Sequence, residues 1–394
     1  MGETTTECGE EVAAHFALAP GYRNLNHGSY GTYPLPVRQV LRGIQERTEA
    51  RPDAFVRYEY RTHLLDTSRH AAEEFLCAPR DTCVLVPDTT NGIETVLRSL
   101  ACGAGDVVIT FATVYQAFAN TLAYLAQTTQ LRTTTVDYTL PVSDASICAA
   151  LEAAIIAARA AGQTPRLVLF DTINALPGVR MPFERLTALC RAHSVLSCID
   201  GAHGIGQLRL DLGALDPDFF VTSCHKWLYV PRGCGVLYVP QRFVANFANI
   251  GTLDDSSYMC IPAAIRWRVA LTWQGRTGEE AITAYGLHLA RAGGQIVAEI
   301  LGTEVLENDE GTLGNCAMTN VRLPLALTHA TALEDAGGWI METMITKHST
   351  SVNVFSYAGA WWVRLSAPVY VTCEDFRTAG LQLREICEDM KARI

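Results

Sequence analysis

The decisive stretch of this sequence is Phe220-Val221-Thr222-Ser223-Cys224-His225-Lys226-Trp227. It is an apolar run that ends in small hydroxyl residues, a histidine and then a lysine. A Gly-rich segment at 231–235 and a second apolar run at 236–239 follow it. Short, continuous apolar runs are typical of strands that are covered on both faces. We therefore expect a buried strand that ends at the lysine.

A second motif stands upstream, where the apolar run 195–199 ends in Asp200-Gly201-Ala202-His203-Gly204. A lone lysine at a strand end is most often a solvated side chain. Here an acid at the end of one strand precedes a lysine at the end of the next, beside a histidine and a glycine-rich loop. Pyridoxal 5'-phosphate (PLP) needs this pairing, because a lysine binds its aldehyde and an acid holds its ring nitrogen. The sequence therefore predicts PLP as the cofactor.

Composition narrows the class of protein. The 394 residues exceed one ordinary core and predict two domains. A formal net charge of −10 without any Lys/Arg cluster argues against a nucleic-acid partner, and no apolar stretch is long enough to cross a membrane. The 13 cysteines lack zinc spacing and include no Cys-x-x-Cys, so we expect reduced, mostly buried thiols in the cytoplasm and no metal site.

The middle of the chain alternates short apolar runs with helical patterns, which predicts an α/β fold with a mostly parallel, seven-stranded sheet flanked by helices. After about residue 261 the pattern changes to a smaller α+β domain. We therefore divide the chain into an N-terminal segment and substrate loop (1–30), a large PLP-binding domain (31–260) and a small C-terminal domain (261–394). The strands expected in the sheet are 83–86, 106–110, 131–136, 167–170, 195–199, 220–223 and 236–239.

Ligands of parallel sheets bind at the carboxyl ends of the strands, where polar motifs of this chain are expected. Thr90, Asn91 and Gly92 open a helix after the first strand, and helix N-termini bind phosphate through backbone N–H groups. An ordinary helix cap is the alternative interpretation. Ser223 and His225 would add donors to the same phosphate.

Two further strand ends carry residues suited to a flat ring. Tyr115 follows the second strand and could stack on a cofactor, although a tyrosine in isolation is more often a packing residue. Asn174 follows the fourth strand and could hydrogen-bond the phenolic oxygen of the ring, although asparagine is also a common turn residue.

Two segments outside this region predict a substrate pocket. Asn26, His27, Ser29 and Tyr30 belong to a polar, Gly-rich loop that could line it. Arg364 is the one charged residue in the apolar run 361–365, and a buried guanidinium needs an anion. A substrate carboxylate would satisfy it, and a structural salt bridge is the alternative.

Taken together, these motifs resemble class V, fold-type I PLP enzymes of the aminotransferase superfamily, over nearly the whole chain. The chain is similar to the isopenicillin N epimerase-like branch, and within it to fungal enzymes of the ergothioneine C–S lyase type and the loline-pathway type. The motifs that carry the resemblance are Asn-His-Gly-Ser-Tyr-Gly at 26–31, Asp-Gly-Ala-His-Gly at 200–204, Ser-Cys-His-Lys-Trp at 223–227, Pro-Arg-Gly-Cys-Gly at 231–235, Gly-Thr at 251–252 and Arg-Leu-Ser at 364–366.

The resemblance implies roles for these residues. Lys226 would form the Schiff base, Asp200 would bind the pyridinium and Tyr115 would stack on the ring. His203 and Asn174 would flank the phenolic oxygen. Thr252 would reach the phosphate of a neighbouring subunit, which implies a homodimer with shared sites. The phosphate of the same subunit would be held by Thr90, Asn91, Gly92, Ser223 and His225.

The resemblance also implies the type of chemistry: an external aldimine with an amino acid, and abstraction of its Cα proton to give a quinonoid. Relatives with sulfur chemistry often stack a histidine where this chain has Tyr115, and the ergothioneine type has a cysteine where 132–137 has none. We therefore expect a tailoring enzyme of secondary metabolism, with Mannich-type cyclisation ahead of C–S lysis. Epimerisation and transamination use the same residues and remain open.

Overall fold

A computed structural model describes residues 5–100, 102–243, 254–326 and 336–392. Its centre is the predicted seven-stranded sheet, in the order β3-β9-β8-β7-β6-β4-β5, with β9 alone antiparallel to its neighbours. This confirms the predicted mostly parallel sheet. The strands are β3 (Cys83–Val86), β4 (Asp106–Phe111), β5 (Arg132–Val136), β6 (Thr164–Asp171), β7 (Leu196–Asp200), β8 (Phe219–Ser223) and β9 (Gly235–Tyr238).

Helices cover both faces of this sheet, which explains why its strands are nearly continuous apolar runs. Side chains of α6 and α7 pack on one face, and those of α8 and α9 pack on the other. Their bounds are α6 (Thr89–Ser99), α7 (Gln116–Thr128), α8 (Asp144–Ala160) and α9 (Phe183–Ala192), and two short helices, α10 (Leu212–Leu215) and α11 (Cys224–Trp227), flank β8.

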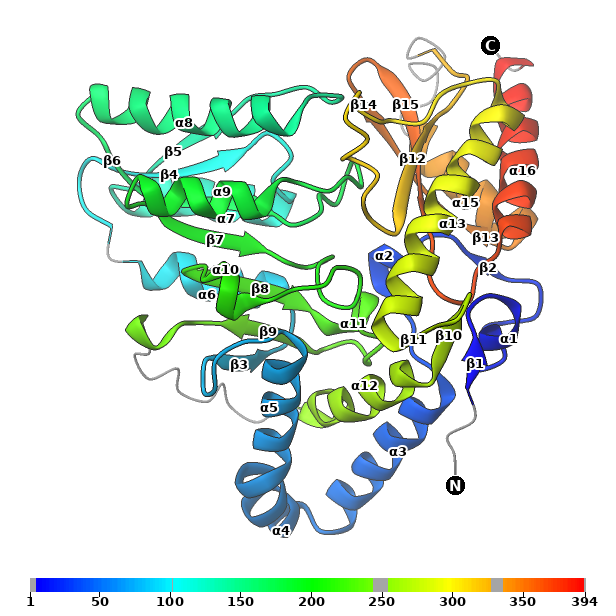
Figure 1. The fold of residues 1–394 in the computed structure, drawn as a ribbon, viewed down its shortest axis with the longest axis horizontal. Helices are drawn as coiled ribbons and strands as arrows, with labels where there is room; N and C mark the ends of the chain where they lie inside the picture. The colour runs from blue at the N-terminus through cyan, green and yellow to red at the C-terminus, as the bar shows by residue number, and fades with distance from the viewer. Residues whose placement is uncertain (1–4, 101, 244–253, 327–335, 393–394) are drawn as a thin grey trace.

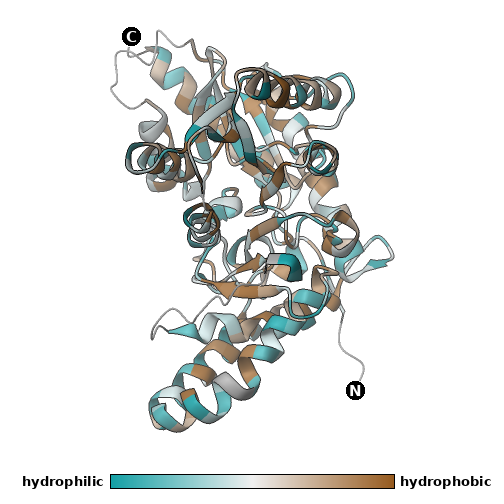
Figure 2. Ribbon diagram, turned by 90° about the vertical axis from the view of Figure 1, so that its left-hand side faces the viewer, coloured by the Kyte–Doolittle hydropathy of each residue, from teal (hydrophilic) through white to brown (hydrophobic). Residues whose placement is uncertain are grey.

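A helical arm extends from the large domain and was not predicted (Figure 1). Its inner side chains join the core on the α8/α9 face of the sheet, while its outer surface is polar. Figure 2 shows this mixture as alternating teal and brown on the projecting helices. The arm comprises α3 (Leu35–Ala50), α4 (Pro52–Ala54), the π-helix η1 (Phe55–Leu64) and α5 (Leu65–Phe75).

The smaller unit faces the carboxyl ends of the parallel strands (Figure 1). Its sheet has the order β12-β15-β14, and α13 and α16 pack together against it. Two N-terminal strands pair with C-terminal ones, β1 with β10 and β2 with β13, so the N-terminal segment belongs structurally to this unit. The bounds are β1 (Thr6–Glu7), α1 (Glu10–Ala13), β2 (Arg23–Asn24), α2 (His27–Tyr30), β10 (Leu271–Trp273), β11 (Arg276–Thr277), α13 (Gly278–Leu301), β12 (Met318–Arg322), α15 (Ala336–His348), β13 (Thr350–Ser351), β14 (Asn353–Tyr357), β15 (Ala360–Ser366) and α16 (Cys373–Ala392).

We propose a boundary between the two units that lies later than the expected residue 260. The 3-10 helices η2 (Gln241–Phe243) and η3 (Asp255–Cys260) precede α12 (Ile261–Val269). Helix α12 packs against α3 and α5 of the arm, and therefore belongs with the large domain. We accordingly place the proposed boundary near residue 270, between α12 and β10.

Within the described ranges, no helix is long and apolar enough to cross a membrane. No group of three or more His, Cys, Asp or Glu side chains in the same ranges could hold a metal ion. All 13 cysteines are described, and all are free thiols.

Candidate active site

Lys226 lies in α11, directly after β8 ends at the edge of the sheet. Its Nζ atom lies 3.2 Å from Nε2 of His203. Burial lowers the pKa of Lys226 to about 8, and the charge of Arg364 adds to this effect. A neutral amine is the form that attacks an aldehyde, and near neutral pH this lysine is much closer to that form than an exposed lysine would be.

Asp200 ends β7 and is buried, where Oδ1 accepts a hydrogen bond of 2.8 Å from the backbone N–H of Ala202. A second buried acid, Asp171, ends β6 at the position directly opposite Asp200. The two carboxyl groups share a hydrogen bond, and burial together with the charge of Asp200 raises the pKa of Asp171 well above its usual range. Two neighbouring buried carboxyls cannot both ionise at low cost, so we assign the proton of the pair to Asp171.

Asp171 was missed by the sequence analysis, although a signal existed. It terminates an apolar strand in the same way as Asp200 does, and parallel strands bring such ends together.

The raised pKa of Asp171 has a consequence for stability. The folded protein holds a proton that the unfolded chain releases above about pH 3.9. The free energy of unfolding should therefore fall as the pH rises from about 4 towards the folded pKa, by about 1.4 kcal/mol per unit. Asp171→Asn removes this slope and retains a donor to Asp200. We expect its unfolding free energy relative to wild type to increase with pH, measured by urea denaturation of cofactor-free protein.

The control for this experiment is Asp309→Asn, because Asp309 is an exposed acid. Parallel pH profiles of wild type and Asp171→Asn would show that Asp171 is ionised in the folded protein.

The N-terminus of α6, where a phosphate cradle was expected, lies against β8. Gly92 packs so closely on β8 that an added Cβ would lie 2.3 Å from Cγ1 of Val221. Ser223 hydrogen-bonds Thr89 at 2.7 Å, and Thr89 was not among the predicted residues. Asn91 is exposed, and its side-chain and backbone N–H groups both bond Oδ1 of Asp88, at 3.0 and 2.8 Å. The side chain of Asn91 therefore serves the helix cap.

Tyr115 and Asn174 lie at the ends of β4 and β6, as predicted. The Tyr115 side chain is 47% exposed, so its ring is free to stack on a ligand. Asn174 is fully buried, and its Nδ2 lies 3.2 Å from the hydroxyl of Tyr138. Tyr138, which was not predicted, is itself held by Thr113 at 2.6 Å.

Arg364 lies on β15 and is 2% exposed. Nη1 donates to the carbonyl of Ala175 at 2.6 Å, and Nη2 donates to Asn26 at 2.9 Å and Ser29 at 2.8 Å. Among the described residues Arg364 forms no salt bridge with an acid, so the structural salt bridge considered above is not found. Burial lowers its pKa to about 10. The guanidinium is thus held in place by neutral groups and still lacks a counter-ion.

The loop 26–31 contributes differently from the prediction. His27 is fully buried, and its ring nitrogens contact the backbone carbonyl of Lys226 at 2.7 Å and the hydroxyl of Tyr370 at 2.8 Å. With both nitrogens occupied, His27 positions the Lys226 segment and has no free atom for a substrate. Tyr30 is 73% exposed, and no side-chain bond to the site is seen for it. Thr252 lies outside the described residues.

Three buried polar atoms at this site have no partner within the described structure: Nε of Arg364, Oδ1 of Asn174 and Nδ1 of His225. Buried polar atoms are normally paired, and unpaired ones concentrated at one place indicate a polar ligand. The anchoring lysine, the acid pair, the exposed aromatic ring and the helix N-terminus match the parts of PLP. The residues present therefore fit this cofactor.

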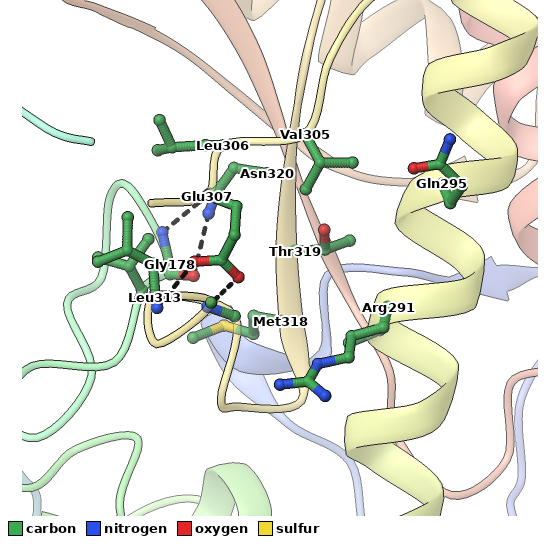
Figure 3. A pocket seen from close by; sticks show the side chains of 14 residues that line it. Gly178, Arg291, Gln295, Val305, Leu306, Glu307, Leu313, Met318, Thr319 and Asn320 are labelled. Carbon is green, nitrogen blue, oxygen red and sulfur yellow. Dashed lines mark hydrogen bonds between the residues drawn. The ribbon is translucent and has the colours of Figure 1, made fainter. Parts of the chain in front are cut away.

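A cavity of about 410 Å³ lies between α13, β12 and the segment 305–314 (Figure 3), and Lys226 is not among its lining residues. Asn320 and Gly178, which do line it, are joined by hydrogen bonds of 2.9 and 3.0 Å. The carboxylate of Glu307 in the cavity is already bonded to the backbone N–H groups of Leu313 and Gly314. The chemistry of Lys226 is therefore not located in this cavity.

Comparison with known proteins agrees with this geometry. Residues 51–377 match the aminotransferase class-V family. The chain belongs to this family. It is therefore a PLP-dependent enzyme.

Two class V relatives span nearly the whole chain. The L-cysteine desulfhydrase-like protein lolT1 of Epichloe uncinata is 34% identical, covering 98% of this chain and 97% of its own. The hercynylcysteine sulfoxide lyase of Schizosaccharomyces pombe is 25% identical, covering 96% and 98%. Among solved structures, a cysteine desulfurase from Thermococcus onnurineus has a TM-score of 0.75 at 17% identity, covering 98% of this chain and 100% of its own. The cystine C–S lyase C-DES has a TM-score of 0.76 at 16% identity, covering 93% and 98%. These two structural similarities show the fold alone.

Proposed function

We propose that this class V enzyme binds an α-amino acid through its carboxylate at Arg364 and removes the Cα proton with Lys226. The observation that supports this most is the state of Arg364, a buried guanidinium without an acidic partner in the described structure. It lies close enough to Lys226 for its charge to lower the pKa of the lysine. A buried cation of this kind is stable only when an anion is supplied.

The other residues have complementary roles in this proposal. PLP, when bound, withdraws electrons from the Cα atom of an attached amino acid. Lys226 anchors the cofactor and then moves the proton, and Asp200 accepts a hydrogen bond from the ring nitrogen. Tyr115 stacks on the ring, while Asn174 and His203 flank its phenolic oxygen. The phosphate is held by Thr90, Asn91, Gly92, Ser223, His225 and, from a second subunit, Thr252.

For the later step we propose Mannich-type ring closure, as in loline-type enzymes of secondary metabolism. The positions of the thiols argue against sulfur transfer to the enzyme. Cys77 and Cys102 precede β3 and β4, and so lie at the amino ends of the strands, away from Lys226. Cys316 lies near Arg364, but burial raises its pKa to about 12, which leaves it unreactive.

A second candidate is C–S bond cleavage by β-elimination, which requires no enzyme thiol. The relatives favour it, because they include a sulfoxide lyase, an L-cysteine desulfhydrase from Arabidopsis thaliana and a putative one from Oryza sativa. Both candidates begin with the same proton removal at Lys226 and differ in the substrate.

Product analysis separates these reactions. The purified PLP-loaded enzyme is incubated in heavy water with a panel of amino acids, including cysteine, a cysteine S-conjugate and an amino acid that carries an imine in its side chain. Mass spectrometry should detect a cyclised product without deuterium at Cα, because the new bond to the imine carbon replaces the Cα–H bond. Release of pyruvate with a thiol, sulfide or sulfenate would contradict ring closure and support elimination.

The same experiment reports on two other outcomes. Deuterium at Cα with unchanged connectivity would indicate epimerisation, and a keto acid would indicate transamination. The Lys226→Ala protein serves as the blank, because it lacks the proposed base.

We further propose a cytoplasmic homodimer. The free state of all 13 cysteines is consistent with a reducing compartment. The dimer rests on the family resemblance at Thr252.

A further inference from the structure

The imidazole of His203 is held from two sides by the segment that carries the catalytic lysine. The indole Nε1 of Trp227 lies 3.2 Å from Nδ1 of His203, and Nζ of Lys226 lies 3.2 Å from Nε2. Gln207 donates to the backbone carbonyl of His203 at 2.9 Å and fixes the main chain. His203 and Trp227 are both buried. A ring turned over by 180° would present carbon atoms to both partners, so these contacts fix its orientation.

The contact with Trp227 determines where the ring carries its proton. An indole N–H can only donate, so Nδ1 of His203 must accept. Burial and the positive charge of Lys226 lower the pKa of His203 well below its usual range, so the ring is neutral. A neutral imidazole has one N–H, and with Nδ1 accepting it must be on Nε2. The titratable groups nearest to the ring are Lys226, Arg364, His225 and His27.

The position of this proton decides what His203 can do. An Nε2–H group faces Lys226, and an ammonium group has no lone pair to accept it. The 3.2 Å contact is therefore a hydrogen bond only when Lys226 is a neutral amine. In the other tautomer, Nε2 would accept from the ammonium and favour the charged lysine.

We propose that Trp227 is a positioning residue that holds His203 in its Nε2-protonated tautomer. His203 then donates a hydrogen bond into the site, towards Lys226 and the place of the phenolic oxygen, and does not act as a base. What this does for turnover rests on the proposed function, whereas the tautomer itself exists in the cofactor-free protein. The two ideas can therefore fail separately.

The first test is the tautomer of the wild-type protein. Cofactor-free protein with ¹⁵N-labelled histidine is studied by long-range ¹H–¹⁵N correlation, and the signal of His203 is assigned from its absence in His203→Gln. The expected pattern is a protonated Nε2 and an unprotonated Nδ1. A protonated Nδ1 in the wild type overturns the proposal without any need for a further variant.

The second test removes the donor. Trp227→Phe retains most of the ring but has no N–H. The chain offers a matched control in Trp267, a buried tryptophan of the same core cluster whose Nε1 donates to Nδ1 of His15 at 2.9 Å and not to His203. Trp227→Phe should shift His203 towards the Nδ1-protonated form, and Trp267→Phe should leave it unchanged. An unaltered His203 signal in Trp227→Phe, or an equal shift in both variants, overturns the proposal.

The third readout is the capture of added PLP by cofactor-free protein, followed by absorbance as a function of pH. Loss of the Nε2–H donor should raise the pKa of Lys226 by roughly half to one unit, so that capture near neutral pH slows roughly three- to tenfold. The midpoint of the rate–pH profile should move to higher pH in Trp227→Phe alone. A uniform loss of rate at every pH would indicate a structural defect and contradict the assigned role.

Discussion

Lys226→Ala is expected to abolish turnover, with a loss of about 10⁴-fold or more, because one side chain serves both as the anchor of PLP and as the proposed base. The variant should also lack the absorbance band of lysine-bound cofactor. Its fold should be retained, because the neighbouring backbone is held independently by His27, which contacts the carbonyl of residue 226 at 2.7 Å. Kinetics with the substrate found by product analysis, together with the spectrum, checks this result.

The composition of the chain makes it easy to tell Lys226 from other lysines in this test. Only three lysines are present, at positions 226, 347 and 391. Lys347 is exposed and pairs with Glu385 at 2.6 Å, so Lys347→Ala is a suitable control. Borohydride reduction of the PLP-loaded enzyme should label the peptide of Lys226 alone. A label on another lysine, or wild-type turnover of Lys226→Ala, would disprove the assigned role.

The sequence was sufficient for the parts of the site that follow strand ends. Lys226, Asp200, Tyr115 and Asn174 each follow a recognisable apolar run, and the carboxyl ends of parallel strands meet at one edge. The topology therefore brought them together without any information on side-chain packing.

The contacts that the sequence could not predict depend on the direction in which a side chain faces around a helix, and on residues that are distant in sequence. The hydrogen bond between Thr89 and Ser223 depends on which residue of the first turn faces Ser223, because a shift of one residue rotates the side chain by about 100°. The contacts of His27 could not be predicted, because its partners, Tyr370 and the carbonyl of Lys226, are distant in sequence. The helical arm at 35–75 was not predicted either.

The sequence also left the partner of Arg364 undetermined. Its position on an apolar strand was visible in the sequence, but a structural salt bridge was an equally good explanation. Only the packed structure shows that its neighbours are the neutral groups of Ala175, Asn26 and Ser29. Because Arg364 has no acidic partner among the described residues, a substrate carboxylate is the expected counter-ion.

Arg364→Lys should raise KM and lower kcat/KM by roughly two orders of magnitude, equivalent to about 2.7 kcal/mol of transition-state binding. Lysine retains the charge but not the planar fork, which can grip a carboxylate with two hydrogen bonds. That grip would orient the Cα–H bond of the substrate towards Lys226, so its loss affects the proton removal as well as binding. PLP affinity should stay unchanged, because the hydrogen bonds of Arg364 in the described structure go to Ala175, Asn26 and Ser29 and not to the phosphate cradle.

The control is Arg322→Lys on the neighbouring strand β12, where the arginine is exposed and pairs with Glu304 at 2.9 Å. It tests the same chemical change in the same sheet, away from Lys226, and should leave the kinetics unchanged. The Arg364→Lys protein is then compared by steady-state kinetics and by PLP titration. Wild-type kinetics, or a loss of PLP affinity in place of substrate affinity, would show that Arg364 supports the structure of the site and does not bind the substrate. Weaker binding of a carboxylate-containing inhibitor, with equal binding of its amide analogue, would locate the lost contact at the carboxylate itself.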